Sequence, residues 1–193
     1  MAAAIGNAYR RAFEASPWAT LAVANGTLSV VADSLAQTFE HRDKARAGEN
    51  MQWDMARSGR FLAFGVGMAP LLAEWNFFIE RRFPLRTQLG KVSLAALGRR
   101  VAVDQIAFAP FGLALFVGAM GLMEGHTSAA ALEKKYHDLY MPALLANWKV
   151  WPLIQLINFR FMPLGLRVPF TSVCGIAWTL FLSILNEQKE HNN

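Results

Sequence analysis

Long uncharged stretches alternate with short charged ones along this chain. Four windows of about 20 mostly apolar residues contain at most one charged side chain each. They run from Trp18 to Phe39, from Phe61 to Ile79, from Val101 to Met123 and from Val168 to Leu185. A helix needs about 20 such residues to cross a hydrocarbon core of about 30 Å. The pattern predicts an all-α bundle of four transmembrane helices, in one polytopic membrane domain over residues 1–193.

The segment at about 139–162 is apolar but interrupted. Its uncharged centre, Val150 to Phe159, is too short to span a bilayer and is bounded by Lys149 and Arg160. Prolines divide the segment further, at positions Pro142, Pro152 and Pro163. We interpret it as a short interfacial or re-entrant helix that precedes the last span.

Small and polar residues recur at helical spacing within each span. Two such stripes are Ala22, Gly26, Ser29, Asp33 and Gln37 in the first span, and Ala63, Gly67, Pro70 and Glu74 in the second. Because helices in lipid associate through small residues and polar contacts, we expect these stripes to form the helix contacts of the bundle. The candidates for a polar seam or a pore lining are Asp33, Gln37, Glu74, Asp104, Gln105, Ser172, Thr179 and Ser183.

The three acids within the spans allow two interpretations, because an ionised carboxylate inside a membrane is costly unless it is paired or faces water. In the first, each acid is neutralised locally: Asp104 by Arg100 one turn away, Glu74 by Arg81, and Asp33 through Gln37. In the second, the acids and the hydroxyl groups of the last span line a hydrated path. Both interpretations stay open at this point.

Composition and charge agree with a membrane protein. Hydrophobic residues make up 54% of the chain and charged residues 17%, well below the roughly 25% that is usual in soluble domains. The net charge of +5 is spread over both sets of loops, nine Lys and Arg on one predicted side and ten on the other. This even spread argues against a nucleic-acid partner and leaves the orientation in the membrane undecided.

The sequence shows no sign of catalytic machinery. It lacks a phosphate-binding GxxxxGK[ST] loop, an HExxH zinc motif and a GxSxG nucleophile motif. Its four histidines fall outside the spans, and its single cysteine, Cys174, can form neither an internal disulfide nor a cluster site. We therefore expect no enzyme activity, no cofactor and no metal site.

A long C-terminal run carries a family resemblance. Residues 147–159 read Asn-Trp-Lys-Val-Trp-Pro-Leu-Ile-Gln-Leu-Ile-Asn-Phe, and an Asp104-Gln105 pair stands in the third span. The run resembles the signature of the Mpv-seventeen family, also named for the twenty-two-kilodalton peroxisomal membrane protein, and above all its fungal Sym-one-like members. The matching motif residues are Trp148, Trp151, Pro152, Gln155, Asn158, Phe159, Pro163, Arg167 and Trp178.

The resemblance implies a multi-pass organellar membrane protein. It suggests a small-solute or metabolite channel of the mitochondrial inner membrane that supports metabolite homeostasis and stress tolerance. The alternative is a non-transporting scaffold or organelle-sorting protein of the peroxisomal membrane. The expected partners are the lipid bilayer, small solutes and further copies of the chain, because four helices enclose little open volume. The second span departs from the family pattern, with Ala73 where the family has a histidine before Trp75.

Overall fold

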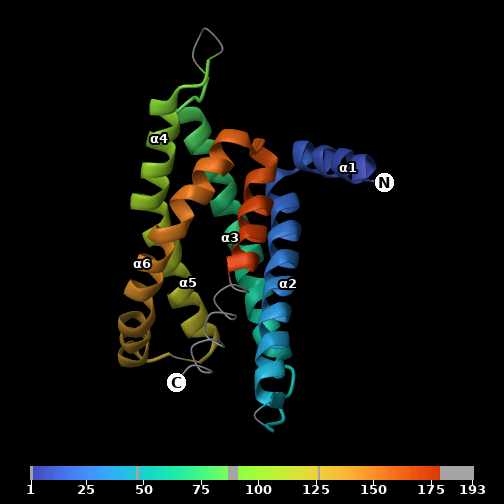
Figure 1. The fold of residues 1–193 in the computed structure, drawn as a ribbon, viewed down its shortest axis with the longest axis vertical. Coiled ribbons are helices and arrows are strands. Elements are labelled where there is room, and N and C mark those ends of the chain that lie inside the picture. Colours follow the sequence, from blue (N-terminus) through green and yellow to red (C-terminus); the bar gives the residue numbers. More distant parts are fainter. Residues whose placement is uncertain (1, 47, 87–90, 126, 179–193) are drawn as a thin grey trace. The chain divides into compact units, whose positions relative to one another are not determined.

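The computed structural model of the chain describes residues 2–46, 48–86, 91–125 and 127–178 (Figure 1). Its helices are α1 (Ala2–Ala15), α2 (Pro17–Arg46), α3 (Met55–Arg82), α4 (Leu94–Val103), α5 (Ala109–Met123) and α6 (Ala129–Phe161). A π-helical turn, Asp104–Phe108, joins α4 to α5, and residues 167–178 are helical again after a 3-10 turn at Leu164–Leu166. Within these ranges no strand occurs, only an isolated bridge between Arg86 and Val92. The all-α fold class is confirmed.

Among the described residues, three helices are long and apolar enough to cross a membrane: Pro17–Arg46, Met55–Arg82 and the continuous run Leu94–Met123. The first three predicted spans lie inside them, and each helix extends past its window because charged residues continue it at one or both ends. Of the fourth predicted span, residues 168–178 are helical. Positions 179–185 lie outside the described residues, so this span stays a prediction.

The segment expected at about 139–162 belongs to a much longer helix. α6 begins at Ala129, continues through Pro142 and Pro152, and is 33 residues long, about 50 Å at 1.5 Å per residue. Ser128 caps its first turn by accepting a hydrogen bond from the Ala131 amide at 3.2 Å. The prediction of a short helix was therefore wrong, because this N-cap and a run of alanines start the helix early.

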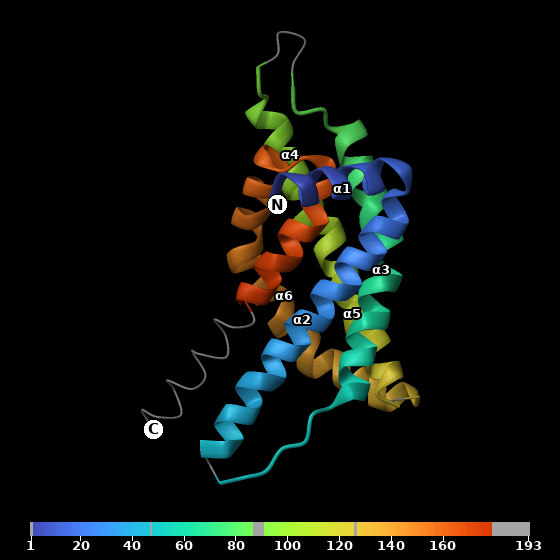
Figure 2. The same ribbon diagram turned by 90° about the vertical axis from the view of Figure 1, so that its right-hand side faces the viewer.

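The chain divides into two compact units, one of residues Met1–Ala73 with Val168–Asn193 and the other of Glu74–Arg167. In the first unit, α1 lies across the beginning of α2 (Figures 1 and 2). α2 and the first part of α3 come very close, because a Cβ added at Gly65 would lie 2.5 Å from the Ser29 Oγ, and one added at Gly26 would lie 2.7 Å from Val66. The Asn25 amide adds a hydrogen bond to the Gly65 carbonyl at 2.7 Å.

The packing face of α3 differs from the stripe that the sequence suggested. Ala63, Gly67, Pro70 and Glu74 are all exposed, whereas Gly65, Ala69 and Ala73 are buried. The expectation for α3 was therefore wrong. The reason is that two parallel sets of small residues run along this helix, and the close approach of Gly26 and Ser29 selects the set that contains Gly65.

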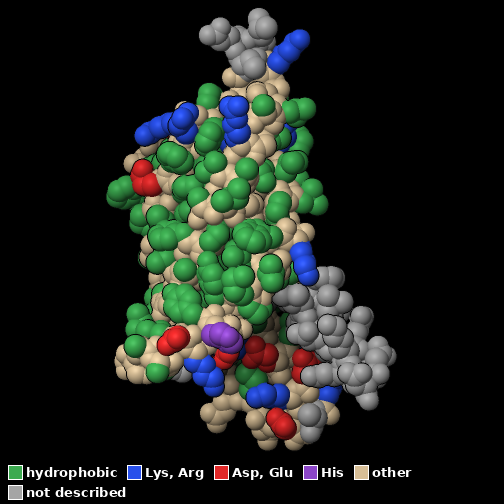
Figure 3. All heavy atoms as spheres, turned by 90° about the vertical axis from the view of Figure 1, so that its left-hand side faces the viewer, with side chains coloured by type: hydrophobic (Ala, Val, Ile, Leu, Met, Phe, Trp, Pro, Cys, Tyr) green, Lys and Arg blue, Asp and Glu red, His purple; other side chains and the backbone are tan. Residues whose placement is uncertain are grey.

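In the second unit, α4 and α5 form one line of helix against which α6 packs. Ile79, Leu97 and Phe159 make its buried core, from α3, α4 and α6 respectively. Tyr136 and Tyr140 of α6 donate hydrogen bonds to the carbonyls of Ala114 and Pro110, at 2.5 and 3.2 Å. The view onto α4 and α6 shows hydrophobic side chains over the middle of this face and charged side chains toward both of its ends (Figure 3).

Candidate functional site

Polar side chains are buried within both units, in two clusters. The Asp33 cluster, in the first unit, consists of Asp33, Gln37, Glu40, Arg57 and Ser58. Asp33 is 1% exposed and Gln37 is fully buried. The Asp33 carboxylate accepts hydrogen bonds from Gln37 Nε2 at 2.8 Å and from Ser58 Oγ at 2.6 Å, and its other oxygen lies 2.7 Å from Arg57 Nε. The expected contact between Asp33 and Gln37 is confirmed.

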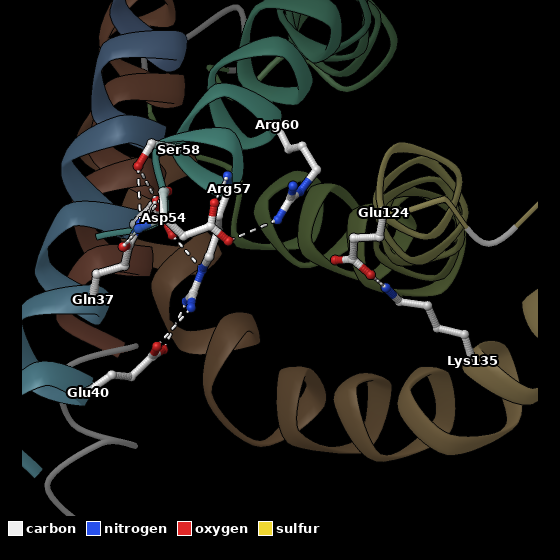
Figure 4. A network of polar contacts seen from close by, with 9 residues as sticks. Gln37, Glu40, Asp54, Arg57, Ser58, Arg60, Glu124 and Lys135 are labelled. Carbon is white, nitrogen blue, oxygen red and sulfur yellow. Dashed lines mark hydrogen bonds and ion pairs between the residues drawn. The ribbon is translucent and has the colours of Figure 1, made fainter. Parts of the chain in front are cut away.

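Arg57 is shared between two carboxylates. Besides Asp33 it binds Glu40 with both terminal nitrogens, at 2.8 and 2.9 Å (Figure 4). Gln37 holds the residue before α3 by accepting from the Asp54 amide at 2.8 Å and donating to the Asp54 carbonyl at 3.0 Å. Asp54 in turn caps α3 by accepting from the Arg57 amide at 2.8 Å. The Asp33 cluster therefore ties the C-terminal half of α2 to the start of α3.

The Asp104 cluster, in the second unit, consists of Trp75, Asp104, Gln105, Asn147, Trp148, Gln155 and Asn158. The Asp104 carboxylate accepts three hydrogen bonds, each of 2.9 Å, from Trp75 Nε1, Gln105 Nε2 and Gln155 Nε2. Asn158 donates to the Gln155 side-chain oxygen at 2.8 Å and Asn147 to that of Gln105 at 2.9 Å. Residues of α3, α6 and the π turn thus meet at one carboxylate.

The π turn explains why two neighbouring residues are both buried in this cluster. Asp104 and Gln105 are 3% and 7% exposed, although consecutive residues of a regular helix point in different directions. The amide of Ala109 bonds to the Asp104 carbonyl, five residues back, and Pro110 has no amide hydrogen to offer the Gln105 carbonyl. Trp148 Nε1 donates to that carbonyl instead, at 2.9 Å. The π turn therefore leaves the Gln105 carbonyl to a side-chain donor from α6.

All described partners of Asp104 are uncharged. Arg100, which the sequence offered as its counter-ion, lies instead 2.8 Å from Glu80 and donates through Nε to the Phe83 carbonyl at 2.7 Å. The expected pairing of Asp104 with Arg100 was wrong. The guanidinium of Arg100 binds Glu80 and the Phe83 carbonyl at the end of α3. The π turn directs the Asp104 side chain toward amide and indole donors instead.

The remaining predicted residues fall in several places. Glu74 is exposed, and the Ser172 hydroxyl contacts the Asn25 side-chain oxygen at 2.9 Å and the Val168 carbonyl at 3.0 Å. Thr179 and Ser183 lie outside the described residues. Of the motif residues not yet placed, Trp151 and Pro152 belong to α6, Phe159 to the core, Pro163 to the turn after α6, Arg167 to an ion pair with Glu80, and Trp178 to the last described helix.

Several cluster members were absent from the sequence-based candidates. Arg57, Ser58 and Glu40 join Asp33, while Trp75 and Asn147 join Asp104. One available signal was the polar side chain of Ser58 just before the second predicted span, but its partner lies 25 residues away along the chain. Across the described ranges, no group of three or more His, Cys, Asp or Glu side chains is placed to hold a metal ion.

Comparison with known proteins places the chain among membrane proteins. A model of the Mpv17 / PMP22 family matches residues 121–183. The chain is 36% identical over 181 residues to Protein sym-1 of Neurospora crassa, covering 93% of this chain and 98% of the relative. It is 34% identical to PXMP2/4 family protein 3 of Dictyostelium discoideum, covering 95% of this chain and 91% of the relative.

The similarity extends to yeast, and it reaches well beyond the part that the family model matches. Protein SYM1 of Saccharomyces cerevisiae is 32% identical over 181 residues, which are 93% of this chain and 89% of the relative. No solved structure matches the chain. Because full-length relatives share more than 30% of their residues with it, the chain is a membrane protein that belongs to the Mpv17 / PMP22 family.

Proposed function

We propose that this protein is a multi-pass protein of the mitochondrial inner membrane that conducts small solutes or metabolites, and so supports metabolite homeostasis and stress tolerance. The observation that carries the proposal is the Asp104 cluster. Asp104 lies in a candidate span, is buried, and accepts hydrogen bonds only from uncharged donors among the described residues. A carboxylate kept inside a membrane at this cost is the default sign of a solute or ion pathway.

The chemistry of the Asp104 cluster suits small polar solutes of several kinds. Gln105, Gln155, Asn147 and Asn158 each carry both donor and acceptor atoms, which can exchange hydrogen bonds with water or with a solute. The carboxylate adds a preference for cations. Weak selectivity with a cationic bias is the expected behaviour, and assembly of several copies would supply the open volume.

The test is a flux measurement with the full chain in planar bilayers and in proteoliposomes. The wild type should conduct, and the Asp104→Asn variant should keep conductance while its permeability ratio of cations over anions falls. Asp138→Asn is the matched control, because Asp138 is an exposed carboxylate on α6 outside the cluster. Absence of conductance across a range of voltages and redox conditions would rule the channel out.

The organelle is tested separately. Labelled protein should be imported into isolated mitochondria. Its membrane-embedded part should stay protected from added protease after the outer membrane alone has been opened. Uptake by peroxisomes instead would favour the alternative location in the peroxisomal membrane.

The Asp33 cluster favours a second function, a non-transporting scaffold or organelle-sorting protein. Both oxygens of the Asp33 carboxylate are held by Arg57, Gln37 and Ser58, so this buried acid is neutralised within the first unit. If Asp104 serves packing in the same way, proteoliposomes will show no solute entry while crosslinking at Cys174 still traps oligomers.

A further inference from the structure

A cavity with a strong positive charge lies within the second unit, beside the C-terminal ends of α3 and α6. Its volume is about 620 Å³. The charged side chains that line it are Glu80, Arg86, Arg100, Arg160 and Arg167, a net charge of +3. Lining residues come from α3, α4, α6 and the connections that follow α3 and α6. The residues involved are separate from the Asp104 cluster.

Two of the arginines compete for a single carboxylate oxygen. Arg100 Nη1 and Arg167 Nη2 lie 2.8 and 2.6 Å from the same Glu80 Oε2. The Arg100 side chain is fully buried and that of Arg167 is 5% exposed, while Glu80 is 41% exposed. The cavity lining carries four guanidinium groups and one carboxylate. Because buried charge is costly unless it is paired, this excess of positive charge favours a further negative group in the cavity.

The two buried arginines are held in place by further contacts besides Glu80. Arg100 Nε donates to the Phe83 carbonyl at 2.7 Å, and Arg167 lies over the Phe159 ring at 5.5 Å from its centre. Arg100 Nη2 is buried and has no hydrogen-bond partner among the described residues. A planar guanidinium with free donors, held rigidly, is well suited to binding phosphate or carboxylate oxygens.

The other two arginines of the cavity lining are more exposed than Arg100 and Arg167. Arg86 is exposed and Arg160 is half-buried, with its guanidinium over the Phe161 ring at 5.1 Å. A purely structural role, in which arginines brace the ends of α3 and α6, accounts for Arg100 and Arg167. It does not account for Arg86 and Arg160 at the same cavity.

We infer that this cavity binds a small anion that carries two or more negative charges on phosphate or carboxylate groups. Its volume falls in the range of about 300–1,000 Å³ that is usual for small-molecule sites, and exceeds what a single phosphate needs. A soluble diphosphate or dicarboxylate and the headgroup of an anionic lipid share this chemistry. The inference is independent of the proposed channel, since it concerns equilibrium binding alone.

The test uses the full-length protein in nanodiscs of phosphatidylcholine, a lipid without net charge, with inorganic pyrophosphate as the probe. Calorimetry should show saturable binding and a rise in unfolding temperature. In the Arg86→Gln/Arg160→Gln variant, affinity should fall at least about tenfold, as expected for the loss of two charge-assisted contacts. The control is Arg81→Gln/Arg99→Gln, which removes the same charge from exposed positions outside the cavity lining and should bind as the wild type does.

A second arm separates the two sources of the anion. The measurement is repeated in nanodiscs that contain phosphatidic acid. If the lipid headgroup occupies the cavity, the unfolding temperature rises without pyrophosphate and pyrophosphate binding weakens; if the site prefers a soluble anion, neither changes. The inference is overturned if neither pyrophosphate nor phosphatidic acid stabilises the wild type, or if the control variant loses as much affinity as the cavity variant.

Discussion

Asp33 and Asp104 are chemically identical side chains in opposite electrostatic surroundings. Asp33 lies against a guanidinium, whereas Asp104 lies among amide and indole groups that carry no net charge. An ion pair inside a membrane protein is neutral toward the lipid, but a carboxylate with neutral donors keeps its charge or must take up a proton. The two acids therefore have different consequences when they are changed.

The Asp33 cluster should depend strongly on its cation. Replacing Arg57 by Gln leaves the buried Asp33 carboxylate without a counter-ion and should lower the free energy of unfolding by about 2 kcal/mol. This is less than the roughly 3–5 kcal/mol that breaking a fully buried ion pair costs, because the Arg57 side chain is 28% exposed. Equilibrium denaturation of the purified protein measures the loss.

Two further variants make this prediction specific. Arg60→Gln is the matched control and should cost less than about 1 kcal/mol, because Arg60 pairs at 3.5 Å with Asp54, whose side chain is 46% exposed. Adding Asp33→Asn to Arg57→Gln should restore part of the stability. Equal losses for Arg57→Gln and Arg60→Gln would show that the buried Asp33–Arg57 pair adds no more to the free energy of unfolding than the exposed Asp54–Arg60 pair does.

At the residue scale, spacing along one helix predicts the contact of Asp33 with Gln37, but it predicts no contact between helices. The four-residue spacing of Asp33 and Gln37 is enough to place them together. The Asp33 contact with Arg57 depends on how α3 packs beside α2, and that of Asp104 with Gln155 bridges 51 positions of sequence. Spacing along one helix cannot supply such partners, so Arg100 looked like the natural counter-ion.

Among the elements, the π turn between α4 and α5 can be traced to a few neighbouring residues. Pro110 removes the amide that could have bonded to the Gln105 carbonyl, and Trp148 supplies the missing donor from α6. π turns of this kind occur frequently at functional sites. The turn therefore couples the backbone of the third span to a motif residue of α6.

This coupling can be measured with a double-mutant cycle. Trp148→Phe should lower the free energy of unfolding by about 1 kcal/mol, because the Gln105 carbonyl loses its donor inside a membrane protein. In a Pro110→Ala background, the restored amide can bond to that carbonyl, so the same Trp148→Phe change should cost much less. Denaturation of all four proteins gives the coupling energy.

Trp151→Phe is the control for the cycle, since the Trp151 indole makes no hydrogen bond among the described residues. It should change stability similarly in both backgrounds. If Trp148→Phe lowers the free energy of unfolding equally in the wild-type and the Pro110→Ala backgrounds, the Trp148 indole does not replace the missing backbone hydrogen bond.

Hydropathy located the apolar elements correctly but not their ends or faces. The windows of uncharged residues lie inside α2, α3 and the run from Leu94 to Met123, because length and apolarity alone decide whether a helix can span. The start of α6 and the packing face of α3 depend on an N-cap and on which glycine a neighbouring helix meets. The start of α6 and the packing face of α3 are determined by specific contacts, and a hydropathy profile contains no information about such contacts.

At the scale of the whole molecule, the length of α6 bears on how often the chain crosses the membrane. α6 starts one short turn after Met123 and ends where Phe159 packs against Leu97, near the beginning of α4. It therefore runs back along the full length of the third candidate span. If Leu94–Met123 crosses the bilayer, we expect α6 to cross it as well, as a further span.

Cysteine labelling tests this expectation in a Cys174→Ser background. Single cysteines at Lys91, Thr127 and Leu164 report the two ends of α6 and the connection before α4. A membrane-impermeant maleimide should label positions 91 and 164 from one side and position 127 from the other. Labelling of 127 and 164 from the same side would support the re-entrant interpretation of this segment.

The shared arginine of the Asp33 cluster also has a consequence for biogenesis. α2 carries its buried acid into the bilayer, but the cation that neutralises this acid belongs to the first turn of α3. A lone α2 would expose a carboxylate to lipid at a cost of several kcal/mol. Insertion machinery should therefore receive the two helices as a hairpin, with release of α2 into lipid delayed until Arg57 has arrived.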